Sequence, residues 1–141
     1  MGEDFAQIRL APLLRVEALY LLGDISIGVV IGAKEGMTTR HPGIHAVERG
    51  AVVILTLMTP ELETALEDGH AITYAAESIN DATGAGWRAS VSGPAEIVVD
   101  PVLRARYRRI LGFELVHGVH ILRLQPKMVE GHRFQRLSAA R

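Results

Sequence analysis

The stretch 79–95 constrains the fold of this chain more than any other part of the sequence. It opens with asparagine, aspartate and two glycines, which favour turns because glycine tolerates positive φ and Asx side chains hydrogen-bond to their own backbone. Trp87, Ala89 and Val91 then alternate with polar residues, which is the period-two pattern of a half-buried strand. Gly93-Pro94 ends the pattern because proline has no N–H for a further ladder bond. The stretch therefore predicts a turn followed by a strand with one buried face.

Composition limits the class of protein. With 141 residues, 48% hydrophobic and 22% charged, the chain fits one globular domain with a real core. A formal net charge of −1 gives no broad attraction to nucleic acid or to an anionic membrane, and no apolar run reaches the length of a membrane span. The absence of cysteine excludes disulfides, thiolate metal sites and a cysteine nucleophile. No signal peptide is visible at the N-terminus, so we expect a cytoplasmic protein.

The rest of the chain predicts strands interrupted by short helices. The expected elements are a helix of about three turns that starts after Pro12 and ends before Gly23, strands over 25–31, 37–47 and 51–57, a short helix from Pro60, strands over 70–76 and around Trp87, a helix over 101–110, and a last strand over 117–124 that closes against the first. Thr59 and Asp100 each precede a proline and are expected to cap the two later helices. Pro42-Gly43 inside a strand indicates a bulge or an edge position.

Two parts of the sequence resemble a known family. The Gly86-Trp87 strand resembles the Gly-Trp-Ser-Val-x-Val-x-Gly-x-Ala strand of small actinobacterial proteins of the pyridoxamine 5'-phosphate oxidase-like family, and 121–134 resembles the family's closing strand and Val-x-Gly-Arg-x-Phe tail. The resemblance covers about 14–134. It implies one domain over 1–141 with a mainly β (α+β) fold, a six-stranded split β-barrel with flanking helices. It also implies a homodimer, and 51–57 supports this because a strand that is apolar on both faces needs cover on both.

The resemblance further implies a flavin site for a small-molecule cofactor, with FMN as the first choice and a deazaflavin as the second. In the family, a Phe-Arg-Thr strand end and a Gly-Ser-Lys helix start hold the flavin phosphate. Leu55-Thr56-Leu57 and Thr59-Pro60-Glu61 stand at these places, so both cations are missing. Arg40 and Arg49 on the flanking hairpin are candidates to reach the phosphate instead. The cofactor-binding residues implied are Pro42, Gly43, Ile44, His45, Thr56, Leu57, Thr59 and Trp87, the last from the partner subunit.

The missing cations leave two main functions open. One is an FMN-binding, oxidoreductase-like protein, for which no catalytic residue is assigned because flavin chemistry needs no dedicated protein acid or nucleophile. The other is a dimeric split-barrel binding or scaffold protein that has lost the flavin. A third hypothesis is haem or metal binding through His41 or His45, but on an undistorted strand these lie about 13 Å apart, and we predict no metal site. Trp87 is also typical of a core anchor, and the arginines of 104–109 of a solvated helix face.

Overall fold

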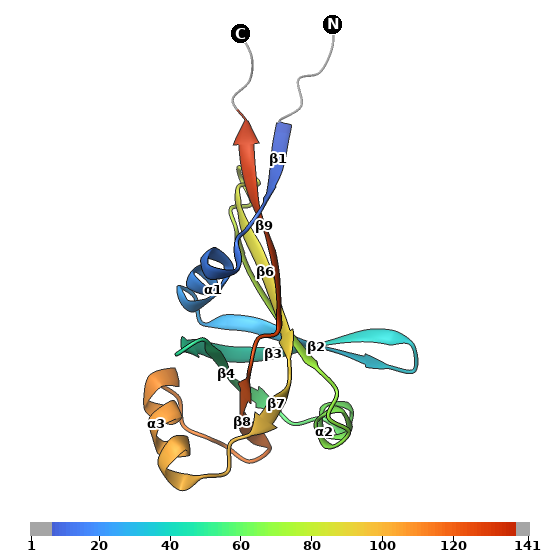
Figure 1. Cartoon of the computed structure of the whole chain (residues 1–141), viewed down its shortest axis with the longest axis vertical. Coiled ribbons are helices and arrows are strands. Elements are labelled where there is room, and N and C mark those ends of the chain that lie inside the picture. Colours follow the sequence, from blue (N-terminus) through green and yellow to red (C-terminus); the bar gives the residue numbers. More distant parts are fainter. Residues whose placement is uncertain (1–6, 138–141) are drawn as a thin grey trace, which may run out of the picture.

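The structure is a computed structural model that describes residues 7–137. It is mainly β, with three helices around one sheet (Figure 1). The elements are β1 (Gln7–Pro12), α1 (Arg15–Gly23), β2 (Ile27–Lys34), β3 (Met37–Glu48), β4 (Ala51–Leu57), α2 (Pro60–Glu67), β5 (Ile72–Ile79), β6 (Gly86–Gly93), β7 (Ala95–Ile97), α3 (Pro101–Leu111), β8 (Val119–Leu124) and β9 (Met128–Leu137). None of these helices has the length and apolar run needed to cross a bilayer.

The sheet has nine strands rather than the six predicted from the sequence. Their order is β1-β9-β6-β5-β2-β3-β4-β8-β7, and every neighbouring pair is antiparallel. β1, β7 and β9 are the additional strands. The mainly β class with flanking helices was predicted correctly, whereas the strand count was wrong.

The N-terminal segment corrects one expectation. Residues 7–12 form β1, which the sequence did not predict, and the helix predicted to start after Pro12 begins at Arg15. β1 pairs with β9 in a register that joins Gln7 to Leu137, and local periodicity contains no signal for a partner so distant in sequence. No element was expected over residues 7–9, and these are β-strand as well.

The predicted closure of the barrel also needs correction. β8 is not the last strand, and it pairs with β4 and β7 rather than with β2. β2 cannot accept it, because β3 occupies one of its edges and β5 the other. The chain returns instead through β9, which pairs with β6 and β1.

Elements with strong local signals form where the sequence predicts them. Thr59 Oγ1 accepts a hydrogen bond from the Leu62 N–H at 3.2 Å, and Asp100 Oδ2 accepts one from the Leu103 N–H at 3.0 Å, so both helix caps are confirmed. The turn between β3 and β4 has Arg49 at φ 51°, and the next residue is glycine at φ 78°. Paired positive φ values give the tight turn that joins twisted antiparallel strands.

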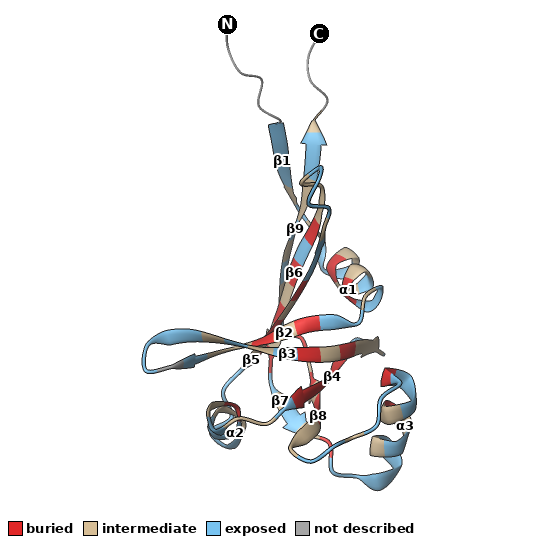
Figure 2. Ribbon diagram, turned by 180° about the vertical axis from the view of Figure 1, so that it is seen from behind, coloured by how far each residue is buried: buried red, intermediate tan, exposed pale blue. Residues whose placement is uncertain are grey.

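β4 is buried on both faces, as its sequence predicts (Figure 2). Val52 and Ile54 belong to the main core, while Val53 and Leu55 pack in a second cluster with residues of α3. The second face is therefore covered by a helix of the same chain. The apolar sequence of β4 therefore no longer supports a homodimer, because no second subunit is needed to cover it.

Gly86 explains why the Gly-Trp pair is required at the start of β6. Its φ is 151°, and a Cβ at this position would lie 2.0 Å from the Ser78 carbonyl oxygen on β5. Only glycine allows the two backbones to approach so closely at the turn. The following side chain, Trp87, then enters the main core and is 7% exposed. This is the anchor role that is typical of a lone tryptophan.

Residues 32–41 of the β2–β3 hairpin, which we name the arm, extend away from the body of the sheet (Figure 1). β2 pairs with β5 only over 29–31, and β3 pairs with β4 only from Gly43. The pairing of β2 with β3 runs regularly through Pro42, so the proline makes no bulge and lies instead beyond the end of the β4 pairing. The two faces of the arm consequently contribute to two different pockets.

Candidate functional site

A row of residues crosses five strands on the outer face of the sheet. Pro42 lies opposite Val29, Val29 opposite Ala75, Ala75 opposite Ser90, and Ser90 opposite Glu130. Directly opposed residues of antiparallel strands point to the same face. The row therefore forms a surface that none of the three described helices covers, because α3 covers the outer face only farther along β3 and β4.

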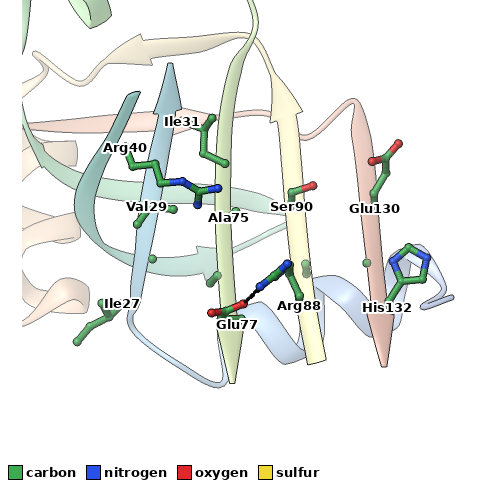
Figure 3. A pocket seen from close by; sticks show the side chains of 14 residues that line it. Ile27, Val29, Ile31, Arg40, Ala75, Glu77, Arg88, Ser90, Glu130 and His132 are labelled. Carbon is green, nitrogen blue, oxygen red and sulfur yellow. Dashed lines mark hydrogen bonds and ion pairs between the residues drawn. The ribbon is translucent and has the colours of Figure 1, made fainter. Parts of the chain in front are cut away.

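A pocket of about 590 Å³, which we name the outer pocket, lies on this face (Figure 3). Its floor is apolar and consists of Ile27, Val29, Ile31 and Ala75. Its volume is within the range of about 300–1,000 Å³ that is usual for small-molecule sites. The polar side chains that line it are Arg40, Glu77, Arg88, Ser90, Glu130 and His132.

The two arginines of the outer pocket differ in whether they form an ion pair. The Arg88 guanidinium donates to the Glu77 carboxylate at 2.6 Å, and both side chains are exposed. His132 lies beside them, because it is opposite Arg88 in the register of β6 and β9. At the other end of the floor, Arg40 extends from β3 across β2 toward Ala75 (Figure 3). Among the described residues, no ion pair includes Arg40.

A smaller pocket of about 260 Å³, the arm pocket, lies between the opposite face of the arm and α2. Thr39 and His41 line it, and Thr39 Oγ1 and His41 Nε2 are buried without a hydrogen-bond partner. Such atoms lose their water without compensation and so favour a polar ligand. Thr59 and Glu61 at the start of α2 line the pocket as well, and the Glu61 side chain takes part in an interaction of its own.

The sequence-predicted site residues fall into two groups. Pro42 and Ile44 share the outer face with the pocket floor, and exposed Leu57 continues that face on β4. Thr56 is buried, and its hydroxyl donates to the Pro42 carbonyl oxygen at 3.1 Å, which fixes the two strands at this point. Thr59 instead caps α2 and lines the arm pocket.

The remaining three predicted residues, Gly43, His45 and Trp87, point to the core. His45 is 3% exposed, and its Nε2 donates to the Leu22 carbonyl oxygen at 2.7 Å. Its Nδ1 is therefore the acceptor for the Tyr74 hydroxyl at 2.6 Å. Burial lowers the pKa of His45, against the opposing effect of the Leu22 hydrogen bond. Gly43 gives Tyr74 room, since a Cβ there would lie 2.9 Å from its ring.

The placement of the histidines bears on the haem or metal hypothesis. Both ring nitrogens of His45 are already engaged, so it cannot ligate a metal without breaking the core hydrogen bonds. His41 lies on the arm, where its Nε2 is buried. Within residues 7–137 there is no group of three or more His, Cys, Asp or Glu side chains that could hold a metal ion.

Sequence reasoning missed the contribution of β5, β6 and β9 to the pocket. The alternation around Trp87 placed Arg88 and Ser90 on the opposite side of the strand from the core, and that signal was present. It did not indicate that Ala75 and Glu130 would join them, because strand order depends on long-range pairing.

The residues present fit a flavin. The apolar floor offers a surface for a planar ring system, and Arg40 offers a cation for a phosphate. The pocket that includes the start of α2 fits a phosphate less well, since the described residues that line it contribute hydroxyls, imidazoles and a carboxylate.

Comparisons with known proteins agree with this fold. No family model matches the chain. It is 28% identical over 124 residues to the uncharacterized protein Rv0080 of Mycobacterium tuberculosis, covering 84% of this chain and 82% of that protein. A crystal structure from Corynebacterium glutamicum, of a protein proposed to be a pyridoxamine 5'-phosphate oxidase, superposes with a TM-score of 0.69 at 24% identity, covering 98% of this chain and 100% of that one.

Two similar structures are FAD-binding proteins. That from Mycobacterium smegmatis has a TM-score of 0.63 at 21% identity and covers 89% of this chain and 98% of its own. That from Mesorhizobium loti has a TM-score of 0.69 at 14% identity and covers 88% and 97%. The resemblance found in the sequence is thus confirmed, and the chain has the split-barrel fold of the pyridoxamine 5'-phosphate oxidase-like proteins.

Proposed function

We propose that this chain is a flavin-binding, oxidoreductase-like protein that acts as a homodimer. The observation that carries the proposal is the outer pocket, with its apolar floor of Ile27, Val29, Ile31 and Ala75 and the arginine at its end. The fold supports it, because similar structures include FAD-binding proteins. FMN is the first flavin to test, and FAD and a deazaflavin follow.

The protein's part in such chemistry is to bind, orient and exclude water. A bound flavin supplies the electron or hydride transfer itself. The floor of the outer pocket would hold the ring, with Pro42 and Ile44 extending the same surface on β3. Ser90 and the Glu77–Arg88 pair provide hydrogen-bonding groups along the opposite side.

The proposed homodimer would cover the outer face. Ile27 is 69% exposed on this face, next to half-buried Val29 and Ile31. The same face has both cationic and anionic side chains, Arg40 and Arg88 together with Glu77 and Glu130. A surface of mixed charge with an apolar centre can pair with a second copy of itself around a two-fold axis.

An absorbance spectrum tests the flavin proposal directly. The purified protein is scanned, mixed with excess FMN, FAD or deazaflavin in separate samples, desalted and scanned again. We expect a retained flavin band near ~450 nm for FMN or FAD. A protein that retains none of the three would refute the proposal and favour the cofactor-free binding or scaffold protein. A Soret-type band in the purified protein would instead favour haem binding through a histidine.

A further inference from the structure

Arg40 is distinguished from the other cation of the outer pocket by its freedom to bind a ligand. Arg88 is engaged by Glu77 at 2.6 Å, whereas no ion pair among the described residues includes Arg40. The Arg40 side chain lies over the apolar floor rather than away from it (Figure 3). Arg40 is exposed, so an anion can reach its guanidinium from solvent while the rest of the ligand lies on the apolar floor beside it.

The position of Arg40 makes the two ends of the pocket chemically different. Arg40 lies opposite Ile31 at one end of the floor, and the floor continues along β2 to Ile27, about 13 Å away at a rise of ~3.3 Å per residue. The far end is lined by the exposed Glu77–Arg88 pair and His132. The pocket therefore matches a molecule with an apolar ring system at one end and an anionic group at the other.

The arm pocket is the competing place for the anion. His41 follows Arg40 directly in sequence, so the two side chains point to opposite faces of β3. One lies in the outer pocket and the other in the arm pocket. A phosphate can therefore contact Arg40 or His41, and substitutions of these two neighbours separate the two sites cleanly.

We propose that Arg40 is the phosphate anchor of the outer pocket and makes it selective for phosphorylated flavins. This rests on the proposed function, since it names the group that recognises the ligand of the same site. The family resemblance implies a phosphate site at the start of α2, where this chain has Thr59, Pro60 and Glu61. In this proposal the phosphate binds instead at Arg40, on the face of the arm that points away from α2. A charge-assisted, bidentate contact from one guanidinium is sufficient to discriminate FMN from riboflavin.

The test compares FMN with riboflavin, which lacks the phosphate. Dissociation constants are measured by quenching of flavin fluorescence for the wild type and for Arg40→Gln, Arg40→Lys, His41→Asn and Arg49→Gln. Arg49 is the matched control, because it is an arginine at the opposite end of β3 and does not line the pocket. We expect Arg40→Gln to weaken FMN binding by about 10- to 100-fold and to leave riboflavin binding unchanged. Arg40→Lys should recover part of the loss.

Each alternative outcome is distinguishable. Riboflavin binding as tightly as FMN to the wild type, or equal losses of both ligands in Arg40→Gln, would overturn the assignment of Arg40 while the flavin proposal stands. A selective loss of FMN in His41→Asn rather than Arg40→Gln would move the phosphate to the arm pocket and also overturn it. If the wild type binds neither FMN nor riboflavin, this inference falls, whereas the proposed function falls only if FAD and deazaflavin are not retained either.

Discussion

Removing the Tyr74 hydroxyl should destabilise the fold through a single lost hydrogen bond. Tyr74 is fully buried and His45 is 3% exposed, so no water can replace the hydroxyl as partner of His45 Nδ1. In Tyr74→Phe, the imidazole keeps its bond to the Leu22 carbonyl oxygen but has a buried acceptor without a donor. Leaving such a group unsatisfied costs about 1–3 kcal/mol, and we expect the free energy of unfolding to fall by that amount.

Urea denaturation monitored by tryptophan fluorescence measures this change. Trp87 is the only tryptophan of the chain and is buried in the same core, so its emission reports unfolding. Tyr20→Phe is the matched control, because Tyr20 is 75% exposed and its substitution should change the unfolding free energy by less than about 0.5 kcal/mol. If Tyr74→Phe changed it no more than Tyr20→Phe, the hydrogen bond would not contribute as its burial indicates.

Three other predictions follow from the structure. Burial lowers the pKa of His45 below its ordinary value of 6.5, so below that pH the unfolded chain binds a proton that the folded chain does not. The free energy of unfolding should therefore fall as the pH drops below 6.5. Urea unfolding curves at a series of pH values measure this fall, and His45→Gln should reduce it. Gly86→Ala should destabilise by about 3 kcal/mol or more through the 2.0 Å approach to Ser78, whereas Gly36→Ala, which has a positive φ but open space around it, should cost only about 1 kcal/mol in thermal or urea unfolding. Ile27→Glu should convert the proposed homodimer to a monomer in analytical ultracentrifugation without unfolding it, and a monomeric wild type would contradict the dimer.

The parts of the fold that sequence predicts are those specified by neighbours in the chain. α2 and α3 follow from a capping side chain and a proline within two residues, and β4 follows from an unbroken apolar run. β1 and β9 were missed or only partly recognised, because their pairing joins the two ends of the described chain. A contact of this kind is specified by the whole topology and by no local pattern.

The same limit applies to where the expected cofactor-binding residues lie on the sheet. Pro42 and Ile44 do lie on the outer face, as strand periodicity and the resemblance suggest. His45 was placed with them from the sequence, yet it points inward to Tyr74, which is 29 residues away in the chain. Residues of odd and even number on β3 belong to different environments, and a stretch of four consecutive residues cannot all face one ligand.

The turn at the tip of the arm has a consequence for ligand chemistry. Glu35 and Gly36 both have positive φ, and this two-residue turn sets the register in which Ile31 faces Arg40. Inserting or deleting one residue at the tip would slip β3 by one position and exchange its faces. A guanidinium would then occupy the pocket beside α2, and an imidazole would occupy the sheet face. A single insertion or deletion at the tip could thus change which side chain meets the anion, and on which face, without any substitution on β3.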